Sequence, residues 1–148
     1  MKYPKYKLKA SSDYLKFEFV SVGVKGKILK TIFYEKVNEP NSYNLAFGDY
    51  METMDDIDDE VVSNNGDAAK VLATVATSIY EFFKIYPNAF LTLSGSSPDR
   101  TRLYRMIIAN NWQEITLDFQ VFARQKGKNW ERFEKNQPYL EFLLIKKQ

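Results

Sequence analysis

The sequence predicts an α+β fold in a single domain, and three observations carry that prediction. Segments that alternate apolar and polar residues, typical of half-buried strands, occur in the first third of the chain and again near its end. Two segments between them repeat apolar residues at helical spacing. The length of 148 residues suits one domain with its own core. We therefore expect 1–148 to form a mostly antiparallel or mixed sheet with two main helices, in the order βββαβαββ.

The first three strands are expected to form an antiparallel meander. Residues 15–24 alternate as a half-buried strand, and Lys25-Gly26 makes a tight turn into a second strand over 27–37. The segment 38–41 predicts another turn, which leads into a third strand over 42–49. Seven acidic residues then lie between Asp49 and Glu60. They predict a solvated loop, with a cation site or a cover that repels anions as the alternative.

The clearest helix follows this acidic segment. Its apolar residues recur at i, i+3, i+4 and i+7 spacing, and they are Val71, Leu72, Val75, Ile79, Phe82, Phe83 and Tyr86. Pro87 ends the run. We expect Asn64 or Asn65 to cap the start, and Asp67 in the first turn suits the positive end of the helix dipole.

The second half of the chain predicts a strand over 90–94, a second helix and two further strands. Ser97 is a candidate N-cap, with Pro98 at the first helical position, and that helix should continue to about Asn110. A strand is expected next, because Ile115, Leu117, Phe119, Val121 and Ala123 alternate strictly with polar neighbours. After a turn at 125–128, residues 129–137 should be irregular or a short helix, and 139–146 the last strand.

The composition excludes several chemistries. Because the chain has no His and no Cys, zinc sites built on imidazole or thiolate, Ser-His-Asp catalysis and Cys-His catalysis cannot occur. We expect a cytoplasmic protein with no metal and no membrane span, because disulfides are impossible and no apolar run approaches the roughly 20 residues that a bilayer requires. The net charge of +2 is too small to indicate nucleic-acid binding, although it does not exclude it.

Three of the five arginines fall within six residues, at Arg100, Arg102 and Arg105. They lie where the strand over 90–94 gives way to the second helix, whose exposed N–H groups suit an anion. On a helical wheel Arg102 and Arg105 lie opposite the apolar sector, so both are expected to be ordinary surface charges. Arg100 falls inside that sector, one turn before Tyr104.

An arginine on the inward side of a helix needs a partner, because a buried unpaired charge is costly. In one interpretation Arg100 forms a salt bridge with an internal carboxylate or donates hydrogen bonds to strand carbonyls inside the protein. The other gives it an external anion, which the Ser96 and Ser97 hydroxyls would help to bind. A second ligand-facing loop is considered at Gly66, where a capped helix start is the alternative.

Two segments of the chain resemble motifs of the GNAT-type acyltransferases. The first is Ser63-Asn-Asn-Gly66-Asp-Ala68, and the second is Asp99-Arg-Thr-Arg-Leu103-Tyr104, which is followed by Asn111-Trp112. The first keeps the small residues of that family's pyrophosphate motif, Gln/Arg-x-x-Gly-x-Gly/Ala, but it has Ser63 at the leading position. The resemblance implies a GNAT-like fold, acetyl-CoA or another acyl-CoA as the cofactor, and Tyr104 as the general acid.

A second resemblance covers nearly the whole chain. The chain is similar in sequence to a group of small bacterial proteins, chiefly from Bacteroidetes, whose function is unknown. The segments that carry this similarity are Asn65-Gly-Asp…Val-Leu-Ala-Thr-Val and Gly95-Ser-Ser-Pro-x-Arg-Thr-Arg-Leu-Tyr-Arg105. It implies no activity.

Three functions therefore stay open. The first is a small cytoplasmic binding module with a site for a small anion or a protein partner at Gly95–Arg105, with Ser96, Ser97, Arg100 and Gly66 as candidate ligand-binding residues. The second is an acyltransferase that uses acyl-CoA, with Tyr104 as its catalytic residue. The third is a structural or protein-partner role, for example in a toxin–antitoxin pair. The sequence does not decide whether the protein is an enzyme or what its oligomeric state is.

Overall fold

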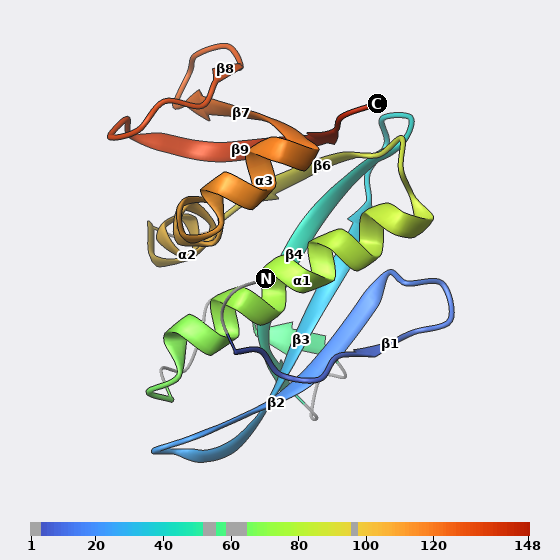
Figure 1. Ribbon diagram of the computed structural model, residues 1–148, viewed down its shortest axis with the longest axis vertical. Coiled ribbons are helices and arrows are strands. Elements are labelled where there is room, and N and C mark those ends of the chain that lie inside the picture. Colours follow the sequence, from blue (N-terminus) through green and yellow to red (C-terminus); the bar gives the residue numbers. More distant parts are fainter. Residues whose placement is uncertain (1–3, 52–55, 59–64, 96–97) are drawn as a thin grey trace.

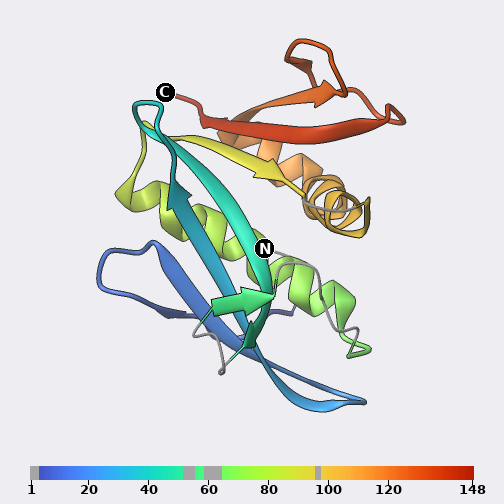
Figure 2. The same ribbon diagram turned by 180° about the vertical axis from the view of Figure 1, so that it is seen from behind.

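The computed structural model describes residues 4–51, 56–58, 65–95 and 98–148 and shows a mixed sheet with its helices on one face (Figures 1 and 2). In chain order the elements are β1 (Lys9–Ala10), β2 (Lys16–Gly23), β3 (Gly26–Lys36), β4 (Ser42–Met51), β5 (Asp56–Asp58), α1 (Ala68–Ile85), β6 (Phe90–Ser94), α2 (Pro98–Asn110), α3 (Trp112–Asp118), β7 (Phe119–Gln125), β8 (Glu131–Arg132) and β9 (Tyr139–Lys146). The predicted α+β class is confirmed.

The described strands form one sheet in the order β1-β2-β3-β4-β6-β9-β7-β8, and β5 pairs with β4 beside this path. The predicted meander is confirmed, with Phe17 opposite Ile32 in β2 and β3, and Ile32 opposite Phe47 in β4. β4 and β6 are parallel, with α1 as the connection between them. β9 lies between β6 and β7, so the last strand of the chain is internal.

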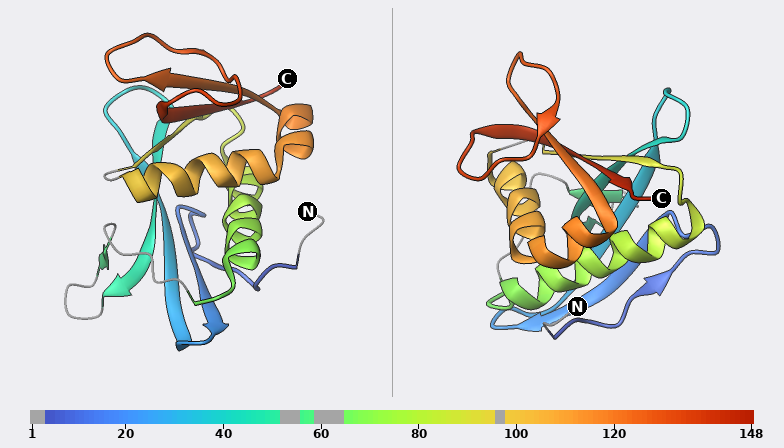
Figure 3. Two further views of the ribbon diagram at one scale, coloured as in Figure 1. Left: turned by 90° about the vertical axis from the view of Figure 1, so that its left-hand side faces the viewer. Right: turned by 45° about the horizontal axis from the view of Figure 1, so that its top comes forward.

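The core lies between the sheet and the helices. α1 packs along the β2–β4 half, where the Phe82 ring stacks on Tyr34 with centroids 4.4 Å apart. The ring of Phe83, the next residue of α1, packs against the ring of Phe119 at the start of β7, with centroids 4.8 Å apart. α2 and α3 cover the β6–β9 half, and α2 crosses α1 (Figure 3). None of the described helices has both the length and the apolar character needed to cross a membrane.

The strand predicted from Ile115 onward is partly wrong. Residues up to Asp118 belong to α3, and the strand begins only at Phe119. Leu117 shows the cause, because it is 76% exposed and does not share the buried face of Ile115 and Phe119. Those two residues are four apart, a spacing that also places them on one side of a helical turn.

The expected cap of the first long helix is also wrong. The N-cap of α1 is Asp67, and no side chain of a described residue makes a capping hydrogen bond at this end. Asn65 is buried elsewhere, against the β2–β3 turn, and Asn64 lies outside the described residues. Ser97, the expected cap of α2, also lies outside them, while α2 spans Pro98–Asn110 as predicted.

Several smaller elements differ from the expectation. β1, the short strand β5 and α3 are additions, and β5 places 56–58 of the acidic segment in the sheet instead of a loop. Most of the remaining acidic segment lies outside the described residues. The segment 129–137, expected to be irregular or helical, includes the two-residue strand β8.

Candidate functional site

The sheet divides at the junction between β4 and β6. These parallel strands pair over three residues only, from Ser42 opposite Phe90 to Asn44 opposite Thr92, and then diverge (Figures 1 and 2). Within the described residues, Leu93 and Ser94 at the end of β6 have no ladder partner on β4. The divergence exposes a stretch of strand edge whose backbone groups need other partners.

A tyrosine hydroxyl replaces the sheet ladder where the strands part. The carbonyl oxygens of Asn41, Tyr43 and Leu45 accept hydrogen bonds in turn from Phe90 N at 2.8 Å, from Thr92 Oγ1 at 3.2 Å and from the Tyr104 hydroxyl at 3.3 Å. The first two donors belong to the β6 side of the junction, whereas Tyr104 comes from α2. Tyr104 is only 2% exposed, so α2 brings a buried hydroxyl to the point of divergence.

Arg100 lies one turn before Tyr104 and is 3% exposed, as its place in the apolar sector predicts. The Arg100 side chain or backbone makes at least one interaction with another part of the protein. Ser96 and Ser97, expected beside it, lie outside the described residues. Their contribution to a ligand site, and that of Arg100, stays a prediction.

A groove of about 630 Å³ lies on the other side of α2, between the start of this helix and the start of β9. Its lining residues come from the end of β6, the first two turns of α2 and the start of β9, and they are Ser94, Gly95, Pro98, Thr101, Arg102, Arg105, Pro138, Tyr139, Leu140 and Glu141. The groove therefore lies at the predicted Gly95–Arg105 segment, but the arginines that line it are Arg102 and Arg105.

The expectation that Arg105 is an ordinary surface charge is wrong. This side chain is half-buried, and its Nη2 donates a hydrogen bond to the Tyr139 carbonyl at 3.0 Å. Its Nε atom is buried and has no hydrogen-bond partner among the described residues. The neighbouring strand β9 explains the difference, because a helical wheel does not show what packs against the polar side of a helix. Arg102 is exposed, as expected.

The lining of the groove also includes a carboxylate with partners on two strands. Glu141 accepts a hydrogen bond from Ser94 Oγ at 3.1 Å through Oε2, and its Oε1 lies 2.7 Å from Arg124 Nη2. The Arg124 guanidinium in turn stacks on the Trp130 ring at 4.6 Å. Sequence reasoning missed Glu141, Ser94 and Arg124, because only the β6–β9–β7 register brings these three residues together.

The segment before α1 is fixed against the β2–β3 turn. Gly66 has a φ of +78°, which favours glycine, and an added Cβ would lie 3.5 Å from Val24. The Asp67 carboxylate lies 2.5 Å from the Tyr6 hydroxyl and 2.6 Å from Ser21 Oγ. Burial and the bond to Asp67 raise the pKa of Tyr6, which keeps its hydroxyl protonated. The positive φ therefore explains why a glycine occupies position 66. A contact between Gly66 and a ligand stays a prediction.

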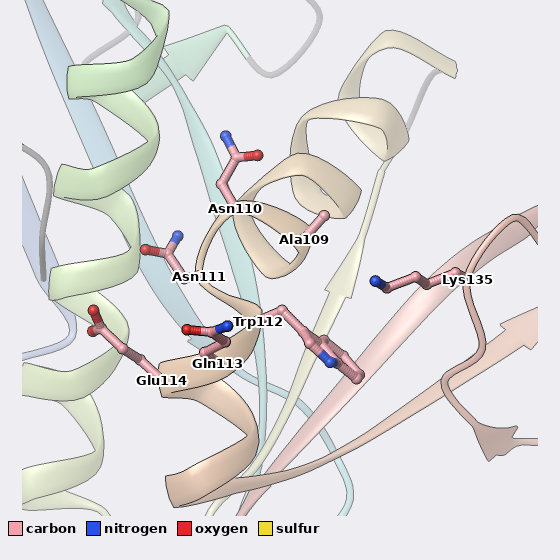
Figure 4. A pocket seen from close by; sticks show the side chains of 7 residues that line it. All are labelled: Ala109, Asn110, Asn111, Trp112, Gln113, Glu114 and Lys135. Carbon is pink, nitrogen blue, oxygen red and sulfur yellow. The ribbon is translucent and has the colours of Figure 1, made fainter.

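A smaller pocket of about 330 Å³ lies at the junction of α2 and α3. Figure 4 shows that Asn111 and Glu114 point toward α1, while Trp112 and Lys135 lie on the other side of the chain. The Asn111 amide bonds Ile107 O at 2.8 Å, and the Trp112 ring packs on Phe133 at 5.0 Å. These contacts explain the Asn111-Trp112 pair as the bend between two helices.

The fold and these sites define an α+β protein whose mixed sheet divides at a parallel junction. A buried tyrosine hydroxyl lies at the junction, and a groove with two arginines lies beside it. The chain belongs to the Family of unknown function (DUF6934), which matches residues 2–147. No match was found among curated proteins or among solved structures.

Proposed function

We propose that the protein is a GNAT-like acyltransferase with an acyl-CoA, such as acetyl-CoA, as its donor. The single observation that carries this proposal is the Tyr104 hydroxyl at the β4–β6 divergence. Diverging strands offer unpaired backbone groups to an extended ligand, and a ligand that bears amides can pair with such an edge as an added strand does. The pantetheine arm of CoA has two amides in an extended chain.

Tyr104 would act as the general acid. When an acceptor nucleophile attacks the thioester carbonyl, the bond between carbon and sulfur breaks and its electron pair goes to sulfur. A proton from the Tyr104 hydroxyl then neutralises the leaving thiolate, and the acceptor returns a proton to the tyrosine through solvent.

The start of α1 supports a place for the CoA pyrophosphate at Gly66 and Ala68. The Asp67 carboxylate points to Tyr6 and Ser21 and makes no capping bond, so it does not occupy the first-turn N–H groups of the helix. Those N–H groups and the positive dipole end favour phosphate. Asp67 therefore weakens this proposal less than its position in the sequence implies.

Two measurements test the acyltransferase proposal. A thermal-shift titration with acetyl-CoA should raise the melting temperature, because a ligand at 100 times its dissociation constant adds roughly 2.7 kcal/mol of stability. Tyr104→Phe should keep acetyl-CoA binding and lower transfer to an amine acceptor by about a hundredfold or more. Tyr139→Phe is the matched control, since Tyr139 is equally buried but lies on β9. The proposal is rejected if millimolar acetyl-CoA does not raise the melting temperature. It is also rejected if the wild type, Tyr104→Phe and Tyr139→Phe transfer the acyl group at equal rates.

A second candidate is an anion-binding module at Gly95–Arg105, and the groove lined by Arg102 and Arg105 favours it. Ser96, Ser97 and Arg100 stay its other proposed ligand-binding residues. Phosphate, sulfate or acetate should then stabilise the fold, and Arg102→Gln should reduce that effect.

A protein-partner or structural role is the third candidate. It is favoured by the interaction of Arg100 within the protein. Bacterial origin and a toxin–antitoxin role are proposals that rest on resemblance alone.

A further inference from the structure

The groove beside α2 has a cationic end on the helix. Arg102 and Arg105 are three residues apart, so they project from the same side of α2, and both line the groove. The half-buried Arg105 keeps Nε without a partner among the described residues, although Nη2 bonds the Tyr139 carbonyl. A buried donor without an acceptor is unfavourable, so an acceptor that enters the groove and reaches this atom would recover stability there.

The rest of the groove is largely apolar or already neutralised. Pro98, Pro138 and the half-exposed Leu140 supply apolar wall on both sides. The Glu141 carboxylate is bonded through both oxygens, to Ser94 and to Arg124, so its charge is balanced by an arginine outside the groove lining. The space of about 630 Å³ is within the range typical of small-molecule sites.

We propose that this groove binds an amphipathic organic carboxylate, with its carboxylate at Arg105 and Arg102 and its apolar body along Leu140 and the two prolines. This inference rests on the anion-binding candidate above and names the ligand class of that site. It does not require acyl transfer.

The chemistry of the groove favours a carboxylate over a phosphate. A guanidinium pairs well with a planar carboxylate, and Nε of Arg105, which has no partner among the described residues, lies on the same edge of the guanidinium as Nη2. Phosphate is also hydrated on every side, whereas the walls at Pro98, Pro138 and Leu140 offer no polar partners for it.

The test uses the full chain, labelled for amide NMR, with acetate, butanoate, hexanoate and octanoate as probes. Octanamide and inorganic phosphate are the reference probes. Affinity should rise by about fourfold for each methylene buried, and amide shifts should concentrate on the groove segments 94–95, 98–105 and 138–141. Octanamide, which keeps the chain but lacks the charge, should bind about ten- to a hundredfold more weakly than octanoate.

Three variants locate the interaction. Arg105→Gln should weaken octanoate by about ten- to a hundredfold, and the exposed Arg102→Gln should weaken it without loss of the Tyr139 bond. Leu140→Ser should reduce the dependence on chain length and leave acetate unchanged. Arg132→Gln is the control, because Arg132 is exposed and does not line this groove.

The outcomes separate this inference from the proposals it rests on. If acetate and phosphate bind but octanoate binds no more tightly, the anion site stands and the amphipathic carboxylate is wrong. If no anion binds, both fail. If octanoate binds equally to the wild type and to Arg102→Gln and Arg105→Gln, the groove is not the site. Acetyl-CoA binding, measured separately with Tyr104→Phe, is unaffected by any of these results.

Discussion

Asn65 is the residue that fixes the start of α1 to the sheet. It is 1% exposed, and its amide makes three hydrogen bonds to the β2–β3 hairpin. Oδ1 accepts from Lys25 N at 2.6 Å, and Nδ2 donates to Gly26 O at 2.9 Å and to Ser21 Oγ at 3.1 Å. An added Cβ at Gly23 would lie only 1.9 Å from Asn65 O, so the hairpin leaves no room for a side chain at that contact.

Asn65→Ala should lower the free energy of unfolding by at least about 2 kcal/mol. The reason is that Lys25 N and Gly26 O lose their partners in a partly buried site. Asn110→Ala is the matched control, because Asn110 is exposed at the end of α2, and it should change stability by less than about 0.5 kcal/mol. Urea unfolding of both variants gives the comparison, and equal values would show that the three bonds carry no net stability.

Asp13 should titrate below the usual range of an aspartate. Its pKa is lowered first by the hydrogen bond from Ser11 Oγ at 2.7 Å and then by that from Leu15 N at 3.1 Å. Because the folded pKa is below the unfolded value of about 3.9, this group contributes stability above that pH. The contribution is lost as the pH falls through the folded pKa. Carboxyl NMR titration should show the Asp13 midpoint rise in Ser11→Ala, and an unchanged midpoint would contradict the assignment.

At the scale of elements, the entrance of α2 is set by close packing at Gly95. An added Cβ there would lie 2.6 Å from Thr101 N and 2.8 Å from Thr101 Oγ1, and contacts this short do not occur in folded proteins. Gly95 at the end of β6 therefore lies against the backbone of the first turn of α2, and only glycine permits this approach. This packing holds Thr101 and the arginines of the groove in place.

Gly95→Ala should destabilise the protein by about 1–3 kcal/mol through overpacking. Adding Thr101→Ala should not restore stability, because the backbone nitrogen of residue 101 stays 2.6 Å from the new methyl group. Thermal unfolding of the single and double variants tests this. Full recovery in the double variant would show that the Thr101 side chain alone causes the clash.

Ile115 and Leu117 should respond very differently to truncation. Ile115 is buried under α3 at 1% exposure, whereas Leu117 is 76% exposed on the same helix. Ile115→Ala should cost about 2–5 kcal/mol, and Leu117→Ala less than about 0.5 kcal/mol. The strand that the alternation predicts here would bury both residues equally, so similar losses would contradict the helix. Urea unfolding gives both values.

The sequence predicts the long elements well because their periodicity is local. The meander and α1 follow from patterns within one segment, and the break at α3 was missed because Ile115 and Phe119 fit both periods. The site is harder to predict. Glu141, Ser94 and Arg124 become neighbours only through strand register, and Arg105 becomes half-buried only because β9 lies beside α2. Neither fact leaves a local signal in the chain.

At the scale of the whole molecule, α1 joins two halves of the sheet whose common ladder is short. The β1–β4 half and the β6–β9 half pair directly over three residues, from Ser42 to Asn44 on the β4 side. The core, in contrast, is one continuous cluster. Phe82 of α1 stacks on Tyr34 of one half, and Phe83 contacts Phe119 of the other at 4.8 Å. Cooperativity between the halves should therefore depend on this helix more than on the ladder.

The two halves should unfold in a single transition. Both tryptophans, Trp112 and Trp130, lie in the second half, so fluorescence reports that half, while far-UV circular dichroism reports the described helices together, with 18 residues in α1, 13 in α2 and 7 in α3. The two probes should give the same urea midpoint, which is the usual test of two-state behaviour. Phe83→Ala should lower both midpoints together, at a cost of about 3–5 kcal/mol, because the ring is 1% exposed between the halves. A fluorescence midpoint that falls alone would mean that the β6–β9 half unfolds independently and that the divergence at Tyr104 is a boundary between two folding units.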